Sequence, residues 1–417
     1  MSRLAPRVVR YGGALFDQDE IDLVNAQLND PMGLIPGAKV AEFEARVAKY
    51  MGKQHGVMVN SGSSALMIAM RLANLPLGSE VITPTLTFSS DVACIYHVGC
   101  TPVFLDVGLD DYQLRVDQIE DVLSDKTRAI LIPDLIGGIC DWDRVREIAD
   151  KHDLFVIHDS ADTLGGKLRG RHTAARADIS ITSFSIFHII TALGNGGMVF
   201  FDDDKYLDRA LALRAWGRSS EKWMWGTKAG QSDGRFLENL DGVEYDGLFI
   251  FEENAYGFIP NECGAAFGIG QMNKIDKLWK MREERFNWHT EYLRRHEDKF
   301  ILPKIIDETE TTWLCYPIQL RPESGWSRRK LQLQLEESGI MSRVIFSGNI
   351  TRHPMMNGNE YRVHPDGLAT ADQIMEHGLM LPCHPTMTKE DCRYMYQVIE
   401  DFIAADGEVC ATPPPSP

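Results

Sequence analysis

Short runs of apolar residues recur along the first half of the chain, several of them separated by stretches with helical spacing. The runs are continuous, as in Ala129-Ile130-Leu131-Ile132 and Met198-Val199-Phe200-Phe201, and do not alternate with polar residues. Similar runs lie at 57–59, 81–82, 103–105, 155–157 and 179–181. Apolar positions recur with helical spacing at 40–51 and at 144–152. Continuous apolar strands that alternate with helices predict an α/β fold, with a mostly parallel sheet covered on both faces.

The pattern changes near residue 264. From there to about residue 299 it predicts one long helical region, which leads into a smaller α+β part. We therefore divide the chain into an N-terminal arm (1–30), a large domain (31–270), a linking helix with a small C-terminal domain (271–405) and a tail (406–417). The large domain carries a polar insertion at 217–253 with weak periodicity. The tail is rich in proline, which predicts disorder.

Charge and cysteine content narrow the class of protein. The formal net charge of -17 argues against a broad surface for nucleic acid or for an acidic membrane. No apolar run reaches transmembrane length and the first residues lack the apolar core of a signal peptide, so we expect no membrane association and a cytoplasmic location. The eight cysteines form no CxxC pair, and we expect neither a bound metal nor a disulfide framework.

Candidate chemistry begins at a turn between a strand and a helix. Asn60 and Ser61 precede Gly62, Ser63 and Ser64, after which an apolar helix starts. Free amides and the positive end of the helix dipole favour a phosphate group at such a turn, and serine hydroxyls add donors. An ordinary helix N-cap is the alternative interpretation.

Two further residues suit a flat, nitrogen-containing ring. Asp159 follows the apolar strand at 155–157, and a carboxylate at the carboxyl end of a parallel strand faces the ligand crevice. Opposite a pyridine nitrogen it would keep that nitrogen protonated, although it could equally cap a helix. Phe88 could stack on a planar ring, although a single phenylalanine is more often part of the core.

The order and spacing of these pieces, followed by the segment 183–188 and the glycines of 194–197, resemble the DegT/DnrJ/EryC1/StrS sugar aminotransferase family. These enzymes use pyridoxal phosphate (PLP) and have fold type I. The resemblance covers roughly residues 8 to 403 and includes 80–88, 101–107 and 264–271. It implies a large domain with a mostly parallel, seven-stranded type of sheet, a smaller C-terminal α+β domain and a homodimer.

By this resemblance, Ser183 and the turn of Gly62, Ser63 and Ser64 bind the cofactor phosphate. Asp159 pairs with the pyridine nitrogen, and Phe88 stacks on the ring. His188 stands where the family carries its Schiff-base lysine, and no lysine occurs between Lys167 and Lys205. A lysine amine binds the cofactor covalently, whereas an imidazole can only form hydrogen bonds or move protons.

The histidine is typical of a small branch that uses pyridoxamine phosphate (PMP), the sugar 3-dehydratases. This branch includes GDP-4-keto-6-deoxymannose 3-dehydratase and CDP-4-keto-6-deoxyglucose 3-dehydrase. The segment 346–354 is also similar to the branch and implies that Asn349 and Arg352 bind substrate. The resemblance therefore implies a 3-dehydratase of a 4-keto sugar, nucleotide-linked, in deoxysugar or antibiotic biosynthesis. His188 and Asp159 would be its catalytic residues and glutamate its amino donor.

One departure from the branch concerns iron. The cytidine-sugar member holds an iron–sulfur cluster with cysteines that lie mostly in the insertion, but no cysteine occurs here from Asp141 to Glu262. We therefore expect no cluster. Two alternatives stay open: an aminotransferase that works without the lysine, and a catalytically silent protein that binds cofactor or sugar. The sequence leaves the nucleotide, the sugar and the amino donor open.

Overall fold

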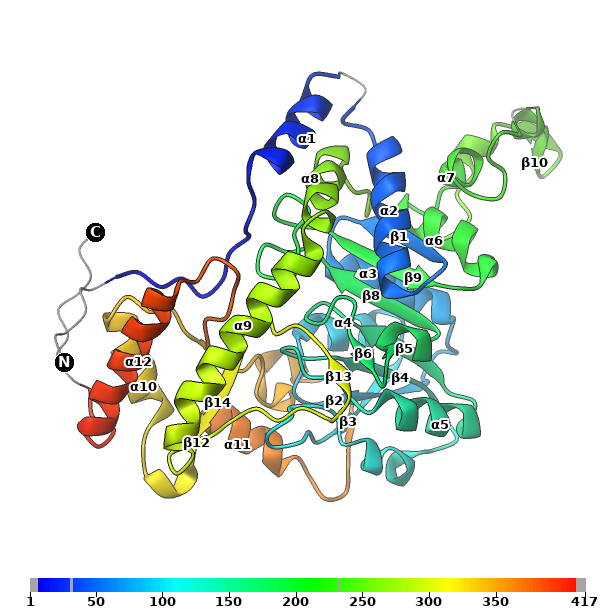
Figure 1. Cartoon of the computed structure of the whole chain (residues 1–417). Helices are drawn as coiled ribbons and strands as arrows, with labels where there is room; N and C mark the ends of the chain where they lie inside the picture. Colours follow the sequence, from blue (N-terminus) through cyan, green and yellow to red (C-terminus); the bar gives the residue numbers. More distant parts are fainter. Residues whose placement is uncertain (1–6, 31–32, 232, 410–417) are drawn as a thin grey trace.

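Two β-sheets organise the chain in the computed structural model, which describes residues 7–30, 33–231 and 233–409. A large sheet lies on the right in Figure 1 and a small one at the lower left, with the long helix α9 (Ile275–Leu293) running between the two parts. Of the tail predicted to be disordered (406–417), the structure describes residues 406–409, where Asp406 accepts a hydrogen bond from the Trp326 ring, and residues 410–417 lie outside the described residues.

The large sheet has eight strands and is mostly parallel. Only β9 runs antiparallel to its neighbours. The predicted fold class is therefore confirmed, with the seven expected strands and a short eighth strand from the C-terminal part at the edge. In spatial order the strands are β1 (His55–Val59), β9 (Gly197–Phe201), β8 (Ile179–Ser183), β5 (Phe155–Asp159), β4 (Thr127–Pro133), β2 (Glu80–Pro84), β3 (Thr101–Leu105) and β16 (Arg362–Val363).

Helices cover both faces of this sheet because successive strand residues point to opposite sides. In β4, Ala129 and Leu131 pack in a cluster with α3 (Gly62–Ala73), whereas Ile130 and Ile132 pack with α5 (Trp142–His152). The other helices of this half are α1 (Gln18–Leu28), α2 (Ala38–Met51), α4 (Ser89–His97), α6 (Leu207–Arg214) and α8 (Glu262–Met272). A sheet buried on both faces explains why its strands have continuous apolar sequences.

The C-terminal part is built on a four-stranded antiparallel sheet. Its apolar core joins Phe286 of α9 with Ile318 of the sheet and Phe402 of the last helix. The strands, in spatial order, are β12 (Phe300–Ile301), β14 (Tyr316–Leu320), β17 (Gly378–Leu381) and β15 (Arg343–Val344), and the helices are α10 (Arg328–Glu337), α11 (Ala369–His377) and α12 (Lys389–Ala404).

Strand pairing crosses the predicted domain boundary at residue 270. β16 pairs with β3 of the large sheet, and β13 (Thr309–Glu310) pairs with β6 (Lys167–Leu168), which in turn pairs with β7 (Arg171–His172). The two parts are therefore tied together by hydrogen-bonded backbone as well as by the helix between them. The domain limits given above stay a prediction.

The prediction of one long helical region from 264 to 299 is wrong, because two helices meet there. α8 ends at Met272, and α9 begins at Ile275. Asn273 is the C-cap of α8, and the ammonium group of Lys274 turns toward Glu20 of α1, 2.6 Å away. The break between the two helices therefore lies where the chain contacts α1.

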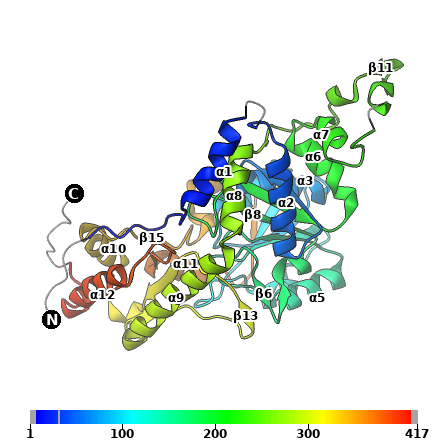
Figure 2. The ribbon, with the colours of Figure 1, turned by 45° about the horizontal axis from the view of Figure 1, so that its top comes forward.

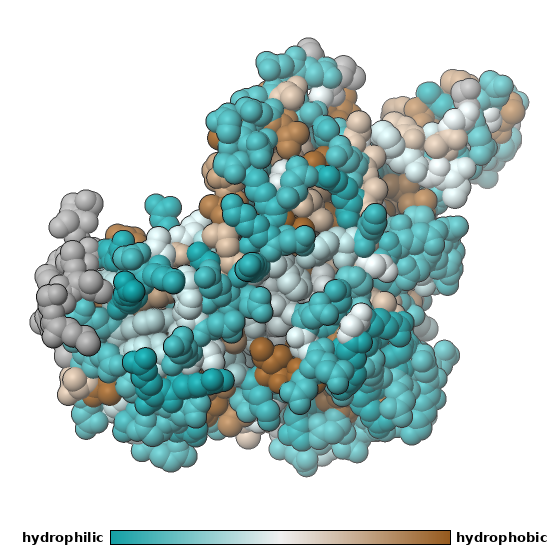
Figure 3. All heavy atoms as spheres, in the orientation of Figure 1, coloured by the Kyte–Doolittle hydropathy of each residue, from teal (hydrophilic) through white to brown (hydrophobic). Residues whose placement is uncertain are grey.

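The insertion projects from the body of the molecule as an arm, at the upper right in Figures 1 and 2. It contains α7 (Ser220–Met224) and a hairpin of β10 (Glu238–Leu240) and β11 (Val243–Tyr245). Apolar side chains are unusually exposed on it, and Figure 3 shows brown and tan atoms among the teal ones there. They are Met224, Trp225, Phe236, Leu237, Leu240, Val243, Tyr245, Phe249 and Phe251.

None of the helices in the described ranges is both long and apolar enough to cross a membrane.

Candidate active site

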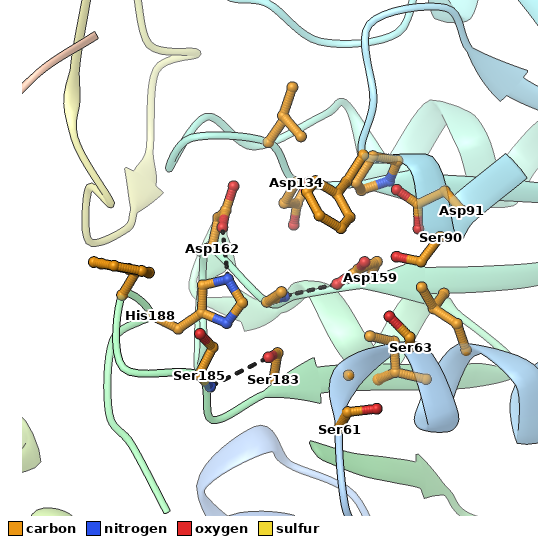
Figure 4. Close-up of a pocket in the computed structure, with 18 of the residues that line it drawn as sticks. Ser61, Ser63, Ser90, Asp91, Asp134, Asp159, Asp162, Ser183, Ser185 and His188 are labelled. Atoms are coloured by element: carbon orange, nitrogen blue, oxygen red, sulfur yellow. Dashed lines mark hydrogen bonds and ion pairs between the residues drawn. The ribbon is translucent and has the colours of Figure 1, made fainter. Parts of the chain in front are cut away.

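A cavity of about 290 Å³ lies at the carboxyl ends of β4, β5 and β8, next to the N-terminal ends of α3 and α4 (Figure 4). Parallel strands place their carboxyl ends at one edge of a sheet, which is where α/β proteins bind ligands. The predicted site residues that line it together are Gly62, Ser63, Phe88, Asp159, Ser183 and His188. The fold thus gathers six residues that are far apart in the sequence.

The N-terminus of α3 forms one end of the cavity. Ser61 caps the helix by accepting a hydrogen bond from the Ser64 amide at 3.1 Å. A Cβ atom on Gly62 would lie 2.6 Å from the Ser183 Cβ, so the strand and helix can approach this closely only with glycine. Helix amides together with the hydroxyls of Ser63 and Ser183 fit a phosphate group.

Ser64 does not share this position. Its hydroxyl donates to the Asn60 Oδ1 at 2.6 Å, and its side chain is not part of the cavity wall. A direct contact of the Ser64 side chain with a phosphate stays a prediction that the geometry does not favour.

Two buried carboxyl groups face each other on the opposite side of the cavity. Asp159 accepts a hydrogen bond from the Ala161 amide at 2.8 Å, and Asp91 accepts one from the Thr87 hydroxyl at 2.6 Å. Burial raises the pKa of Asp91 to about 6 and raises the pKa of Asp159 well above its usual range, with a further increase from the charge of Asp91.

The carboxyl groups of Asp91 and Asp159 also interact directly with each other. Two carboxylates this close resist ionising together unless a cation joins them. The pair therefore suits a protonated pyridine nitrogen, and the residues around the cavity fit a PLP-type cofactor at both of its ends.

His188 lies in the loop between β8 and β9, and its Nε2 is 3.8 Å from the Asp162 Oδ1 (Figure 4). Burial lowers the pKa of His188 to about 4 and raises the pKa of Asp162 to about 7. The imidazole is therefore neutral at physiological pH and available as a base. Because its pKa is about 7, the Asp162 carboxyl group can gain or lose a proton near physiological pH.

A hydrogen bond from a strained backbone position holds Asp162 in place. The Ile136 amide donates to the Asp162 Oδ2 at 2.8 Å, and Ile136 has a φ of 68°. A β-branched residue rarely adopts this left-handed conformation, and such strain of about 1–3 kcal/mol is typical of functional sites.

Aromatic rings form the wall of the cavity toward solvent. Phe88 is 55% exposed and contacts Phe346 edge to face, with ring centres 6.3 Å apart. A second cavity of about 610 Å³ shares Phe88, Phe346 and His188 with the first and adds Tyr11 and Arg343. A ring next to Phe88 would therefore have room beside it for a larger molecule.

The structure does not bring the two predicted substrate residues to either cavity. Asn349 accepts hydrogen bonds from Thr85 and Thr351 at 3.1 and 3.0 Å and donates to Asp372 at 2.7 Å. Arg352 forms an ion pair with the same Asp372. Both side chains already have partners within the chain, and their role in substrate binding stays a prediction.

The sequence reasoning missed Asp91, Asp162, Tyr11 and Arg343. A signal existed for Asp162, which follows Asp159 by three positions in the turn after a strand. No signal marked Tyr11, Asp91 or Arg343, because they reach the site from separate elements.

Comparison with known proteins decides the family. The model of the DegT/DnrJ/EryC1/StrS aminotransferase family matches residues 15–400. The chain belongs to this family. It is 30% identical over 410 residues to the dTDP-4-dehydro-2,6-dideoxy-D-glucose 3-dehydratase of Saccharopolyspora spinosa, covering 95% of this chain and 87% of that protein. It is 28% identical to the GDP-perosamine synthase of Caulobacter vibrioides, covering 85% of this chain and 87% of that protein.

Solved structures share the fold. A GDP-4-keto-6-deoxymannose-3-dehydratase with a trapped PLP-glutamate geminal diamine has a TM-score of 0.83 and 21% identity, covering 94% of this chain and 99% of that chain. An aminotransferase from Psychrobacter cryohalolentis has a TM-score of 0.83 and 23% identity, covering 94% and 98%. The family depends on PLP, and several similar solved structures contain PLP or PMP. The expected family, fold type and cofactor class are confirmed. The chain belongs among PLP-dependent sugar-modifying enzymes that include both 3-dehydratases and aminotransferases.

Proposed function

We propose that this chain is a PMP-dependent dehydratase that removes the C3 hydroxyl of a nucleotide-linked 4-keto sugar in deoxysugar biosynthesis. The observation that carries the proposal is His188, a neutral histidine in the cavity, which by the resemblance would stand at the position of the family lysine. A histidine cannot hold the cofactor covalently but can move protons. The 3-dehydratase names of several relatives support the same reaction.

The two ends of the cavity would hold the cofactor. Ser63, Ser183 and the amides at the start of α3 would bind its phosphate, and Asp159 would pair with its ring nitrogen beside Asp91. Phe88 would cover one face of the ring. When bound, PMP supplies an amine that reacts with a ketone and a protonated ring that withdraws electrons.

His188 and Asp162 would accept and donate the protons of the reaction. The neutral imidazole accepts a proton at a ring nitrogen, and its protonated form can deliver one to the departing C3 oxygen, which leaves as water. Asp162, 3.8 Å from Nε2, stabilises the protonated form and can hold the proton between steps. The rings of Phe88, Phe187 and Phe346 limit the access of solvent water to this region.

We further propose that glutamate is the amino donor, that no iron–sulfur cluster takes part, and that the chain acts as a homodimer. The absence of cysteine between Asp141 and Glu262 supports a reaction without a cluster. Exposed apolar side chains on the arm support association, because such patches mark protein interfaces.

The test is an end-point assay with PLP, glutamate and a panel of nucleotide-linked 4-keto-6-deoxy sugars, in which free ammonium and sugar mass are measured together. We expect ammonium release and a product that has lost the C3 oxygen. An amino sugar without ammonium would instead show a transaminase, which the similarity to GDP-perosamine synthase makes the second candidate. Cofactor binding without any turnover would favour the silent homologue.

The role of His188 is tested in the same assay with His188→Asn. We expect turnover to fall roughly 100-fold or more, because general acid–base catalysis contributes about that much. His172→Asn, which changes a histidine of β7 outside the cavity, is the matched control. Near-normal turnover of His188→Asn would contradict the mechanism.

A further inference from the structure

A buried arginine on α9 contacts the backbone of His188. Arg282 is 2% exposed, and its Nη2 donates to the His188 carbonyl oxygen at 3.0 Å. Its Nη1 donates to the carbonyl oxygens of Trp313, Leu314 and Cys383 at 3.1, 3.2 and 3.1 Å. One guanidinium group therefore joins three backbone positions of the C-terminal part to the residue proposed as the base.

Carbonyl oxygens, and not a carboxylate, compensate the buried positive charge of this guanidinium. In the described ranges no carboxylate forms an ion pair with Arg282, although Asp162 acts on it at longer range. A buried charge without an ion pair is costly, so carbonyl oxygens must compensate it. These four hydrogen bonds connect the C-terminal part to the His188 loop through one side chain.

The His188 side chain itself is weakly anchored. Its Nδ1 has no well-formed hydrogen bond within the described residues, its Nε2 is 3.8 Å from Asp162, and the ring also interacts with the Ser183 backbone. The firm polar contacts of this residue are made by its backbone, whose amide donates to the Ser185 carbonyl at 3.0 Å and whose carbonyl accepts from Arg282. Arg282 therefore holds the backbone from which the imidazole extends.

We propose that Arg282 is a positioning residue that holds the His188 backbone and so sets the place of its imidazole. The proposal rests on the proposed role of His188. The positive charge of Arg282 adds to the effect of burial, and both lower the pKa of His188. The other titratable or charged side chains around the cavities that His188 lines are Tyr11, Asp91, Asp134, Asp159, Asp162, Arg343 and His353, and the test leaves them unchanged.

Two substitutions separate the effect of Arg282 on the position of His188 from the effect of its positive charge. Arg282→Lys keeps a positive charge but loses the planar group that reaches four carbonyls, so kcat should fall roughly 100-fold while KM and PMP affinity stay within about twofold. Arg282→Met also removes the charge. It should therefore raise the pKa of His188, which shifts the acidic limb of the pH–rate profile upward.

The matched control is Arg285→Lys, one turn along the same helix. Arg285 is also buried and donates to the Met387 carbonyl of the C-terminal part, at 3.3 and 3.1 Å, but does not contact His188. We expect it to leave kcat and the His188 pKa unchanged. Thermal unfolding of each variant reports on folding, and Arg282→Lys carries the test if Arg282→Met does not fold.

The His188 pKa is measured by NMR on protein with labelled histidine, assigned by the signal that disappears in His188→Asn. This titration needs no turnover, so it tests Arg282 even if the protein proves not to be a dehydratase. A His188 pKa that does not move in Arg282→Met would overturn the proposal. So would kcat within twofold of the parent in folded, PMP-bound Arg282→Lys.

Discussion

At the scale of single residues, burial of Asp162 makes stability depend on pH. Its pKa is about 7 in the folded chain, above the value of about 4 in an unfolded one. A carboxyl group whose pKa is raised by folding stabilises the fold below the unfolded pKa, and this contribution is lost as the pH rises through the folded pKa. We therefore expect the cofactor-free protein to lose thermal stability between about pH 4 and about pH 7, and Asp162→Asn to lose less.

The measurement is the melting temperature of both proteins across this pH range, without cofactor. Asn can still accept the hydrogen bond from the Ile136 amide, so the local structure should persist. Asp125→Asn, at an exposed position before β4, is the control and should follow the parent curve. Parallel curves for the parent and Asp162→Asn would count against a raised pKa at Asp162.

Gly62 is a second residue with a testable role. Gly62→Ala places a methyl group 2.6 Å from the Ser183 Cβ, which should cost about 1–3 kcal/mol of stability and weaken PMP binding by moving Ser183. Gly13→Ala meets no atom within 4 Å and should do neither. Calorimetric unfolding and PMP titration measure the two effects. Unchanged PMP affinity in Gly62→Ala would show that Ser183 does not contribute to the phosphate site.

At the scale of elements, the N-terminus of α3 should combine two roles. Ser61→Ala removes the N-cap hydrogen bond, and we expect a loss of about 1 kcal/mol of stability together with weaker PMP binding. Thr388→Ala removes the cap of α12, away from the cavity, and should cost similar stability with no change in PMP affinity. Chemical denaturation and PMP titration give the comparison. Equal PMP affinity in both variants would mean that this helix end does not hold the phosphate.

The helices and strands also show which parts of the fold the pattern of apolar residues predicts and which it misses. Continuous apolar runs located all seven main strands of the large sheet, because burial on both faces leaves a strong local signal. The break between α8 and α9 was missed. Apolar residues continue across it, and the ion pair of Lys274 with Glu20 joins segments about 250 positions apart.

At the scale of the whole molecule, the arm should stabilise a dimer. Leu237→Ser combined with Phe251→Ser removes two of its exposed apolar side chains, which are 68% and 66% exposed. We expect the mass measured by sedimentation to shift from that of a dimer toward that of a single chain. Leu77→Ser, at an apolar position 86% exposed elsewhere on the surface, is the control. A dimer unaffected by the arm substitutions would place the interface on another surface.

The sequence by itself determined the class of sheet and the family, and it predicted that histidine stands where that family carries its lysine. These properties depend on local periodicity and on the order of short motifs, which a single chain displays directly. Tertiary structure alone decided that Asp91 faces Asp159 and that Arg282 donates to the His188 carbonyl. It alone also decided that Asp372 binds the side chains of both Asn349 and Arg352. Such contacts join residues from separate elements, and their distances are set by how the elements pack, which no local pattern encodes.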